Sequence, residues 1–393
     1  MEIGNNMQHP INNDWQVYQF PNFAGGFMPR PTSTNVFSDI VNMEAQRDGS
    51  LKTIYGSRKI NDNDLGGGLV TGIWMGEVYG CEFAIVVATI SPLLWTSPIN
   101  SPDDTNIQLP VTFVDSSGSA ISNGEYWSFA QFYDTTNDNI VLATNEGNDL
   151  IFWDNGKTSA DFQRVLTAPT GCNSICAYNN YLVMSKKPYS IFVSDKDDYA
   201  TWPGTQEILL NANLGLITKV VALPGKLIAF CERGISFTLG SKYSQFSLNF
   251  RDVNTSIGCP FPLSISTYVS DVGFLSDSGP YIWSAGSVSP TYIGSAIEEI
   301  FISRLNVNTN YEEKLKWRGV LTRHSYILTY TGSLSSTDPL GQSDPDSGLT
   351  LIFDRRSNTW ITKLANKRVD NKWAPTFSAW GYSEAAKINL TNI

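Results

Sequence analysis

The side chains that enzymes use most often for catalysis are scarce in this chain. Only two histidines occur among its 393 residues, His9 and His324, and His324 stands in a stretch with the pattern of a β-strand. With so few imidazoles, neither nucleophile–histidine catalysis nor a histidine-rich zinc site is expected. The sequence also lacks a glycine-rich phosphate loop and an HExxH motif. We therefore predict that the protein is not an enzyme and has no catalytic, cofactor-binding or metal-binding residues.

Acidic residues could still support glycoside hydrolysis, which needs two carboxylates facing each other across a sugar. Five candidates stand beside expected strands or turns: Asp115, Asp134, Glu146, Asp154 and Glu232. Sequence spacing pairs none of them, and most lie next to turn-forming residues. A carbohydrate-binding or hydrolysing protein therefore remains an alternative.

The segment Asp195–Trp202 (Asp-Lys-Asp-Asp-Tyr-Ala-Thr-Trp) is similar to the Asp box of sialidases and related hydrolases. It departs from that pattern at Tyr199, where glycine is expected, and at Asp195, where serine is expected. In such boxes the carboxylates hydrogen-bond to backbone N–H groups of a turn. We expect this structural role on an outer hairpin, and calcium binding is the alternative.

Cysteine usage indicates a chain made in a reducing cytoplasm. The five cysteines, at positions 81, 172, 176, 231 and 259, are odd in number and widely spaced, unlike a disulfide framework. Cys172 and Cys176 have the spacing of a metal pair. On a strand, however, they would lie about 13 Å apart, too far for a disulfide, and we do not expect them to bind metal.

The charge balance argues against a surface that wraps nucleic acid. The net charge is −10, and the only dense basic stretch is 363–372. Such a surface would need basic patches to neutralise phosphates, although an acidic wall that repels DNA is compatible with this composition. The first residues, 1–8, lack the features of a secretory signal. The longest apolar run, Phe83–Ile90, is far too short for a membrane span.

A repeat in the sequence predicts the secondary-structure elements that position these side chains. A short strand of buried character recurs at intervals of 42, 45, 45 and 54 residues. The five copies are Asn139–Asn145, Tyr181–Lys187, Lys226–Glu232, Asp271–Asp277 and Ser325–Thr331, and Cys81–Ala88 is interpreted as a sixth. Repeats of this length built only of strands are typical of a β-propeller. The predicted fold is therefore all-β, a propeller of six blades of antiparallel strands.

The second half of each unit repeats a simpler theme, in which a strand is followed by a turn and a large aromatic side chain. The segments are Leu150–Trp153, Ser190–Ser194 with Trp202, Tyr281–Trp283, and Leu351–Asp354 with Trp360. One large aromatic residue per blade suits the wedge-shaped gap between twisted sheets. Short helices between blades are expected at 295–304 and 311–317.

The ends of the chain have different expected roles. Residues 1–33 are rich in Asn, Pro and Gly but carry scattered aromatic side chains, which favours an extended N-terminal arm lying on another surface. Residues 34–393 form the propeller, with the first blade in 34–96 and insertions at 97–110 and 332–349. Strands at 377–380 and 387–390 are expected to pair with strands from 50–90, so that N- and C-terminal strands close the ring.

Three groups of segments carry a resemblance to a known family. They are Thr34–Glu44 followed by Asp48–Gly56; Asn179–Val183 with Val193–Asp195 and Trp202; and Ile228–Gly234 leading to Ser256–Pro260. In these segments the chain resembles the propeller-bearing tail hub or nozzle proteins, and the related head-completion proteins, of short-tailed bacteriophages. The likeness covers most of residues 34–390 and is one of pattern.

The resemblance implies a structural virion protein without enzymatic activity. Such a protein forms a homo-hexamer ring that lines or closes the DNA ejection channel, and it docks portal or adaptor proteins and tail fibre or tip proteins. Double-stranded DNA would pass without sequence-specific contact, and the chain would not insert into a membrane. It would be synthesised in the host cytoplasm and reside in the virion tail. A protein-interaction propeller of a cell is the other alternative.

Overall fold

The computed structural model describes 14 stretches of the chain, and the remaining residues are outside this account. These stretches are 43–45, 51–53, 70–78, 81–88, 126–134, 138–154, 162–204, 207–239, 248–253, 256–298, 314–330, 349–364, 380–383 and 388–391. Their main secondary structure is the β-strand, and the strands are joined by turns, loops and a few 3-10 turns. No helix in these stretches is long and apolar enough to cross a membrane.

Five four-stranded antiparallel sheets dominate the described part of the chain. The first sheet contains β5 (Ser128–Asp134), β6 (Asp138–Thr144), β7 (Ile151–Trp153) and β8 (Gln163–Arg164), and the second contains β9 (Ser174–Tyr178), β10 (Tyr181–Lys186), β11 (Ser190–Val193) and β12 (Ile208–Leu209). The third sheet contains β13 (Ile217–Leu223), β14 (Lys226–Cys231), β15 (Ile235–Leu239) and β16 (Arg251–Asp252), and the fourth contains β17 (Ser266–Tyr268), β18 (Asp271–Ser276), β19 (Gly279–Ser284) and β20 (Thr291–Tyr292). The fifth sheet contains β21 (Trp317–Leu321), β22 (Ser325–Tyr330), β23 (Leu349–Asp354) and β24 (Thr359–Leu364).

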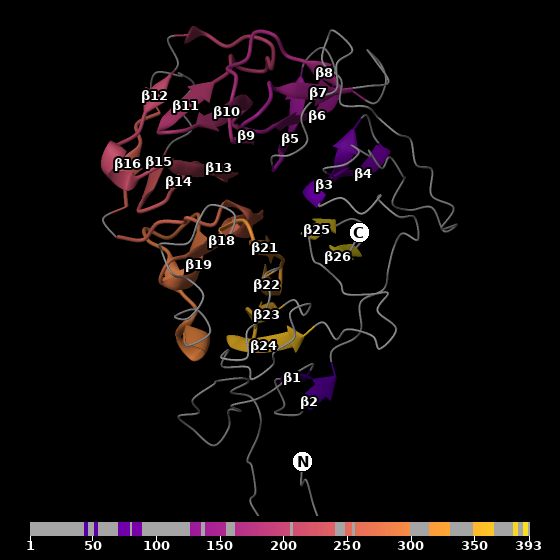
Figure 1. The fold of residues 1–393 in the computed structure, drawn as a ribbon, viewed down its shortest axis with the longest axis vertical. Helices are drawn as coiled ribbons and strands as arrows, with labels where there is room; N and C mark the ends of the chain where they lie inside the picture. Colours follow the sequence, from indigo (N-terminus) through magenta and orange to yellow (C-terminus); the bar gives the residue numbers. More distant parts are fainter. Residues whose placement is uncertain are drawn as a thin grey trace, which may run out of the picture.

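Each sheet is a meander in which consecutive strands are neighbours. The sheets succeed one another around a central region, with β5, β9, β13 and β21 toward the middle and β8, β12 and β16 toward the outside (Figure 1). This arrangement is propeller-like and confirms the predicted all-β class. The five repeat copies are the second strands β6, β10, β14, β18 and β22, and the aromatic segments belong to the third strands.

The second strands carry continuous, largely apolar runs because neighbouring sheets cover both of their faces. Every residue of β14, Lys226–Cys231, is buried, as are the four central residues of β10. An antiparallel strand with one wet face would instead alternate apolar and polar residues. Continuous apolar runs therefore place these strands inside a stack of sheets.

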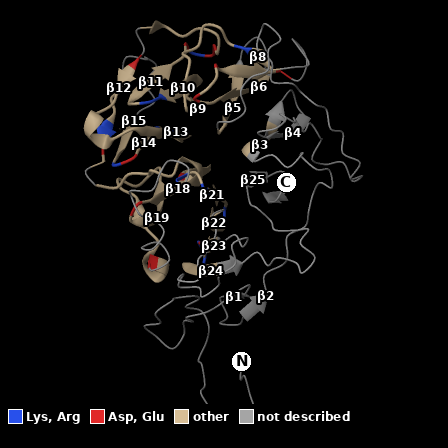
Figure 2. Cartoon of the chain, in the orientation of Figure 1, with Lys and Arg blue, Asp and Glu red and all other residues tan. Residues whose placement is uncertain are grey.

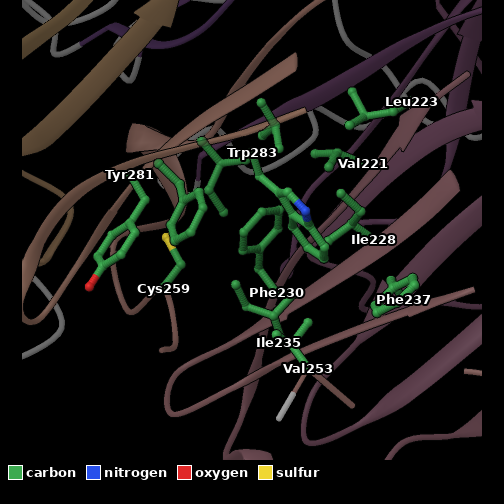
Figure 3. Packing of buried hydrophobic residues seen from close by; sticks show 13 residues of the cluster. Val221, Leu223, Ile228, Phe230, Ile235, Phe237, Val253, Cys259, Tyr281 and Trp283 are labelled. Carbon is green, nitrogen blue, oxygen red and sulfur yellow. The ribbon is translucent and has the colours of Figure 1, made fainter. Parts of the chain in front are cut away.

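Large side chains fill the gaps between adjacent sheets. Between the third and fourth sheets, Phe230 and Phe237 meet Phe274 and Trp283 (Figure 3). Trp283 has no exposed surface, and its ring lies edge-on to Phe237 with centroids 5.5 Å apart. The amine of Lys226 lies 4.6 Å from the Trp283 ring centroid and donates to the carbonyl of Ser287. Trp283 is thus the wedge residue that the sequence predicts.

Serine side chains tie the inner strand of one sheet to that of the next. Ser128 Oγ accepts a hydrogen bond from the backbone N–H of Ile175 at 3.1 Å. Ser174 Oγ accepts one from Val220 at 2.8 Å. Since the innermost strand leaves one backbone edge without a ladder partner, each serine satisfies a donor that the sheet itself cannot.

The tie recurs between the fourth and fifth sheets, where Ser266 Oγ accepts from the N–H of Leu321 at 2.9 Å. Between the third and fourth sheets the equivalent position is Lys219, whose amine donates to the carbonyl of Ile265 at 3.0 Å. The linked residues are 46 or 47 positions apart in three of these ties and 55 in the fourth.

Six further strands form two-stranded sheets in the described chain. They are β1 (Met43–Ala45) with β2 (Leu51–Thr53), β3 (Val70–Val78) with β4 (Cys81–Ala88), and β25 (Trp380–Ser383) with β26 (Ile388–Thr391). Strand β3 lies against β5 and β6, while β25 lies against both β3 and β21 (Figure 1). Strand β1 lies against β24 and thus apart from β3 and β4, with which the sequence grouped it.

Two local expectations need correction. His324 lies in the turn between β21 and β22, where Thr322 Oγ1 accepts from its backbone N–H, and is not in a strand. The helices expected at 295–304 and 311–317 fall only partly within the described residues. A 3-10 turn over Ser295–Ile297 leads into helical backbone at Glu298, and Lys314 is also helical before β21 begins at Trp317. Strands β25 and β26 pair with each other and not with strands from 50–90. The arm, residues 34–42, the insertion 97–110 and residues 332–348 of the other insertion lie outside the described residues, whereas Leu349 begins β23.

Candidate functional site

A hollow of about 90 Å³ lies where the inner strands begin, and we call it the axial hollow. The segments that lead into all five inner strands contribute to it: 126–128 before and in β5, 173–174 at β9, 216–219 at β13, 260–263 before β17 and 314–315 before β21. Ligand pockets for drug-sized molecules occupy about 300–1,000 Å³. The axial hollow therefore suits a group of only a few atoms.

Two ion pairs stand at the wall of the axial hollow. Lys187 pairs with Glu146 at 2.5 Å, and Lys314 pairs with Glu232 at 2.9 Å. All four side chains line the hollow. They come from the turns after β6, β10 and β14 and from the segment before β21, so they meet only because the sheets stack around one centre.

Lys219 contributes a third cation to the axial hollow. It extends from β13 and donates to the carbonyl of Ile265, which leaves two of the three N–H groups of its ammonium for other acceptors. Burial lowers the pKa of Lys219 from 10.5 to about 8, and the nearby thiols of Cys259 and Cys176 oppose this shift. A lysine at the position that carries serine in three other sheets is an exception within the repeat.

Arg318 lies behind one wall of the axial hollow. Its side chain is 5% exposed, its guanidinium carbon lies 5.1 Å from the centroid of the Tyr126 ring, and one terminal nitrogen donates to the Tyr126 hydroxyl at 3.4 Å. Among the described residues, its Nε has no hydrogen-bond partner. Burial lowers the pKa of Arg318 to about 10, while Tyr126, which lines the hollow, opposes that shift.

A second hollow, of about 380 Å³, adjoins the first and shares Leu216, Glu232, Pro260 and Lys314 with it. We call it the lateral hollow. It opens between the turns of the second, third and fourth sheets and is lined by Arg233, which is exposed, and by Asp277. Both hollows therefore lie on the same face of the molecule, at the starts of the inner strands.

The five carboxylates predicted as candidates from the sequence lie in different parts of the molecule. Glu146 and Glu232 line the axial hollow, and each is bound to a lysine. Asp154 is buried at the end of β7, Asp134 ends β5, and Asp115 lies outside the described residues. The sequence named two residues of the hollow without pairing them, and it missed Lys187, Lys219, Lys314 and Arg318. Lys219 could have been found from the sequence by aligning the repeat units on their inner-strand serines, because a lysine stands there where three other units have serine.

The Asp195–Trp202 segment is a turn between β11 and β12, on the outer part of the second sheet. The Asp198 carboxylate accepts from the N–H of Ala200 at 2.7 Å and of Thr201 at 3.3 Å. Trp202 Nε1 donates to the carbonyl of Tyr199 at 2.8 Å. The predicted turn-stabilising role of a carboxylate is thus confirmed for Asp198.

The two cysteines with metal-pair spacing pack into different clusters. Cys172 belongs to the core between the first and second sheets, and Cys176 packs against the core between the second and third. Burial raises the pKa of both thiols to about 12. Among the described residues, no group of three or more His, Cys, Asp or Glu side chains is placed to hold a metal ion.

Comparisons with known proteins find similarity in structure only. The sequence matches no family model and no curated protein. Among solved structures, the chain is similar to the computationally designed Ika8 protein, with 10% identity and a TM-score of 0.42 over 82% of this chain and 93% of that one.

Two further solved structures show comparable similarity. The N-terminal domain of Nup159 has 9% identity and a TM-score of 0.36 over 60% of each chain. YCF48 bound to D1 peptide has 15% identity and a TM-score of 0.35 over 68% of this chain and 85% of that one.

Proposed function

We propose that this chain is a structural virion protein, a ring component of the tail hub or nozzle type. In this proposal residues 34–393 form a six-bladed propeller. Strands β3, β4, β25 and β26 make up the sixth blade, so that both ends of the chain close the ring. The support for closure is that β25 lies between β3 and β21, and β3 lies against the first four-stranded sheet.

The observation that carries the proposal is the construction around the propeller axis. Serine and lysine side chains tie successive inner strands together, and segments from all five sheets converge on a hollow of about 90 Å³. A B-form duplex has a major groove that is itself about 12 Å wide, so it does not fit through one propeller. In this proposal no DNA passes through a single propeller, and the DNA path lies between the copies that form the ring.

The charge of the chain agrees with such a path. The net charge of −10 suits a wall along which DNA slides without sticking. Lysine, arginine and acidic residues are interspersed over the described sheets (Figure 2). Portal or adaptor proteins and tail fibre or tip proteins would dock on the outside, where the arm 1–33 and the insertions 97–110 and 332–349 are the candidate contacts.

Electron microscopy of the purified full chain at two protein concentrations tests this proposal. The expected result is six-fold rings with an opening wide enough for a DNA duplex, more abundant at the higher concentration. A portal or adaptor protein added as an assembly template should convert any remaining single propellers into rings. Single propellers under every condition, with or without the template, would contradict the ring function.

A carbohydrate-binding or hydrolysing propeller is the second candidate, and one observation favours it. Glu146 and Glu232, two of the carboxylates named from sequence, line the same hollow together with Tyr126. Against catalysis, each carboxylate is engaged by a lysine, whereas hydrolysis needs one acid and one base or nucleophile free to act on the sugar. A glycan array followed by hydrolysis assays tests this second candidate function. Loss of glycan binding in both Glu146→Gln and Glu232→Gln would support it.

A further inference from the structure

We propose that the axial hollow is a binding site for one small oxyanion, a phosphate or a carboxylate, held by Lys219. This inference concerns the hollow alone and does not depend on the proposed virion function. The expected ligand is a free ion or small molecule. The argument rests on the size of the hollow, on its charge, and on the two cations whose bonding capacity is incompletely used.

Size limits the ligand. The axial hollow measures about 90 Å³, smaller than an apolar cavity of about 150 Å³ that accepts a benzene molecule. A phosphate or a carboxylate group is of the right scale, whereas a sugar ring with its hydroxyl groups is larger than benzene. The lateral hollow, at about 380 Å³, offers room next to it for the remainder of a carboxylate-bearing molecule.

Charge selects an anion. Among the described residues, three lysines and two glutamates line the axial hollow, in a chain whose net charge is −10. Lys187 and Lys314 are neutralised by Glu146 and Glu232, so Lys219 supplies the excess positive charge. Its partner, the carbonyl of Ile265, is neutral and engages one N–H. Lys219 is half-buried. A cation withdrawn from water without a counter-ion is costly, and a bound oxyanion would supply the missing charge.

Neighbouring groups strengthen the preference for an oxyanion. Asn173 and Thr218 also line the hollow, but Asn173 Nδ2 is engaged by the carbonyls of Ile217 and Thr218. The donors that line the hollow include the ammonium N–H groups and the Tyr126 hydroxyl. Behind Tyr126, the buried guanidinium of Arg318 adds positive potential, and among the described residues its hydrogen-bond partner is Tyr126 and not a carboxylate.

Titration calorimetry on the full chain at low ionic strength tests the proposal, with inorganic phosphate and succinate as separate probes. We expect one ion per chain. Lys219→Met should weaken binding about tenfold, because a hydrogen bond to a charged group contributes about that much. Lys196→Met is the matched control, since Lys196 lies in the outer turn between β11 and β12, and it should leave the affinity unchanged.

A second variant, which is expected to bind the ion more tightly, shows whether weaker binding in Lys219→Met is caused by misfolding. Glu232→Gln removes a negative charge and frees Lys314, so it should tighten binding, by about threefold or more. Binding of phosphate alone identifies phosphate as the ligand chemistry, and binding of succinate alone identifies a carboxylate; both outcomes support the site. Equal affinity in wild type, Lys219→Met and Glu232→Gln, or no binding of either probe, would overturn it.

Discussion

At the scale of single residues, the most demanding packing is that of Trp283. Its side chain fills the space between the third and fourth sheets, against Phe237 and the amine of Lys226. We predict that Trp283→Ala lowers the free energy of unfolding by about 3–5 kcal/mol, because a large buried aromatic side chain leaves a cavity. Urea denaturation of both proteins measures the difference, and a loss below about 1 kcal/mol would contradict the wedge role.

Lys219 makes stability depend on pH. Burial lowers its pKa from 10.5 to about 8, so above pH 8 the unfolded chain holds a proton that the folded chain has lost. The free energy of unfolding therefore rises with pH between 8 and 10.5 as far as this lysine is concerned. The buried cysteines act oppositely from about pH 9 upward, because burial raises their pKa from 9.0 to about 12.

We predict that the difference in stability between wild type and Lys219→Met changes between pH 8 and pH 9. Wild type should gain stability relative to the variant over this interval, since methionine does not titrate. Chemical denaturation of both proteins at several pH values measures this difference. A difference that stays constant with pH would mean that the amine of Lys219 is not desolvated.

At the scale of elements, hydroxyl side chains hold adjacent sheets together. Ser174 accepts from the N–H of Val220 and shares a hydrogen bond with Ser185. We predict that Ser174→Ala costs about 1–3 kcal/mol, because it leaves a buried backbone donor without a partner. Ser289→Ala, at an exposed position, is the matched control and should be nearly neutral in thermal unfolding. Equal effects of the two substitutions would refute the tie between the sheets.

The fourth and fifth sheets approach each other so closely at Gly319 that a residue with a side chain does not fit there without a shift. A Cβ atom at Gly319 would lie 2.2 Å from the carbonyl oxygen of Ser264, whereas one at Gly286 would meet nothing within 4 Å. We predict that Gly319→Ala destabilises the protein by at least about 1–3 kcal/mol, the usual cost of overpacking, and that Gly286→Ala does not. Melting temperatures of the two variants provide the comparison, and similar values would show that the sheets can separate without cost.

At the scale of the whole molecule, the N-terminal arm 1–33 remains a prediction from sequence. Its richness in Asn, Pro and Gly argues against a place in any blade, while its aromatic side chains favour a contact surface. We predict that deleting residues 1–33 weakens ring assembly or docking more than folding. Light scattering and thermal unfolding of the truncated chain separate the two effects. An unchanged oligomer with a greatly lowered melting temperature would assign the arm to the fold.

The sequence by itself determined the elements of this protein. Its apolar strands recur at a nearly constant interval, and those five copies are the second strands of the five sheets. The turn at Asp198 was equally predictable, since its hydrogen bonds link neighbouring residues. Such features depend on local periodicity and on turn chemistry, which a sequence carries directly.

Only the tertiary structure decided which side chains meet. Glu146 and Glu232 belong to different sheets, and their lysine partners Lys187 and Lys314 come from still others. The role of Lys219 also emerges only when the inner strands stand side by side, because its contact with Ile265 spans 46 residues. Contacts between sheets depend on twist, register and stacking, which are set by the packing of the whole molecule and leave no local pattern in the sequence.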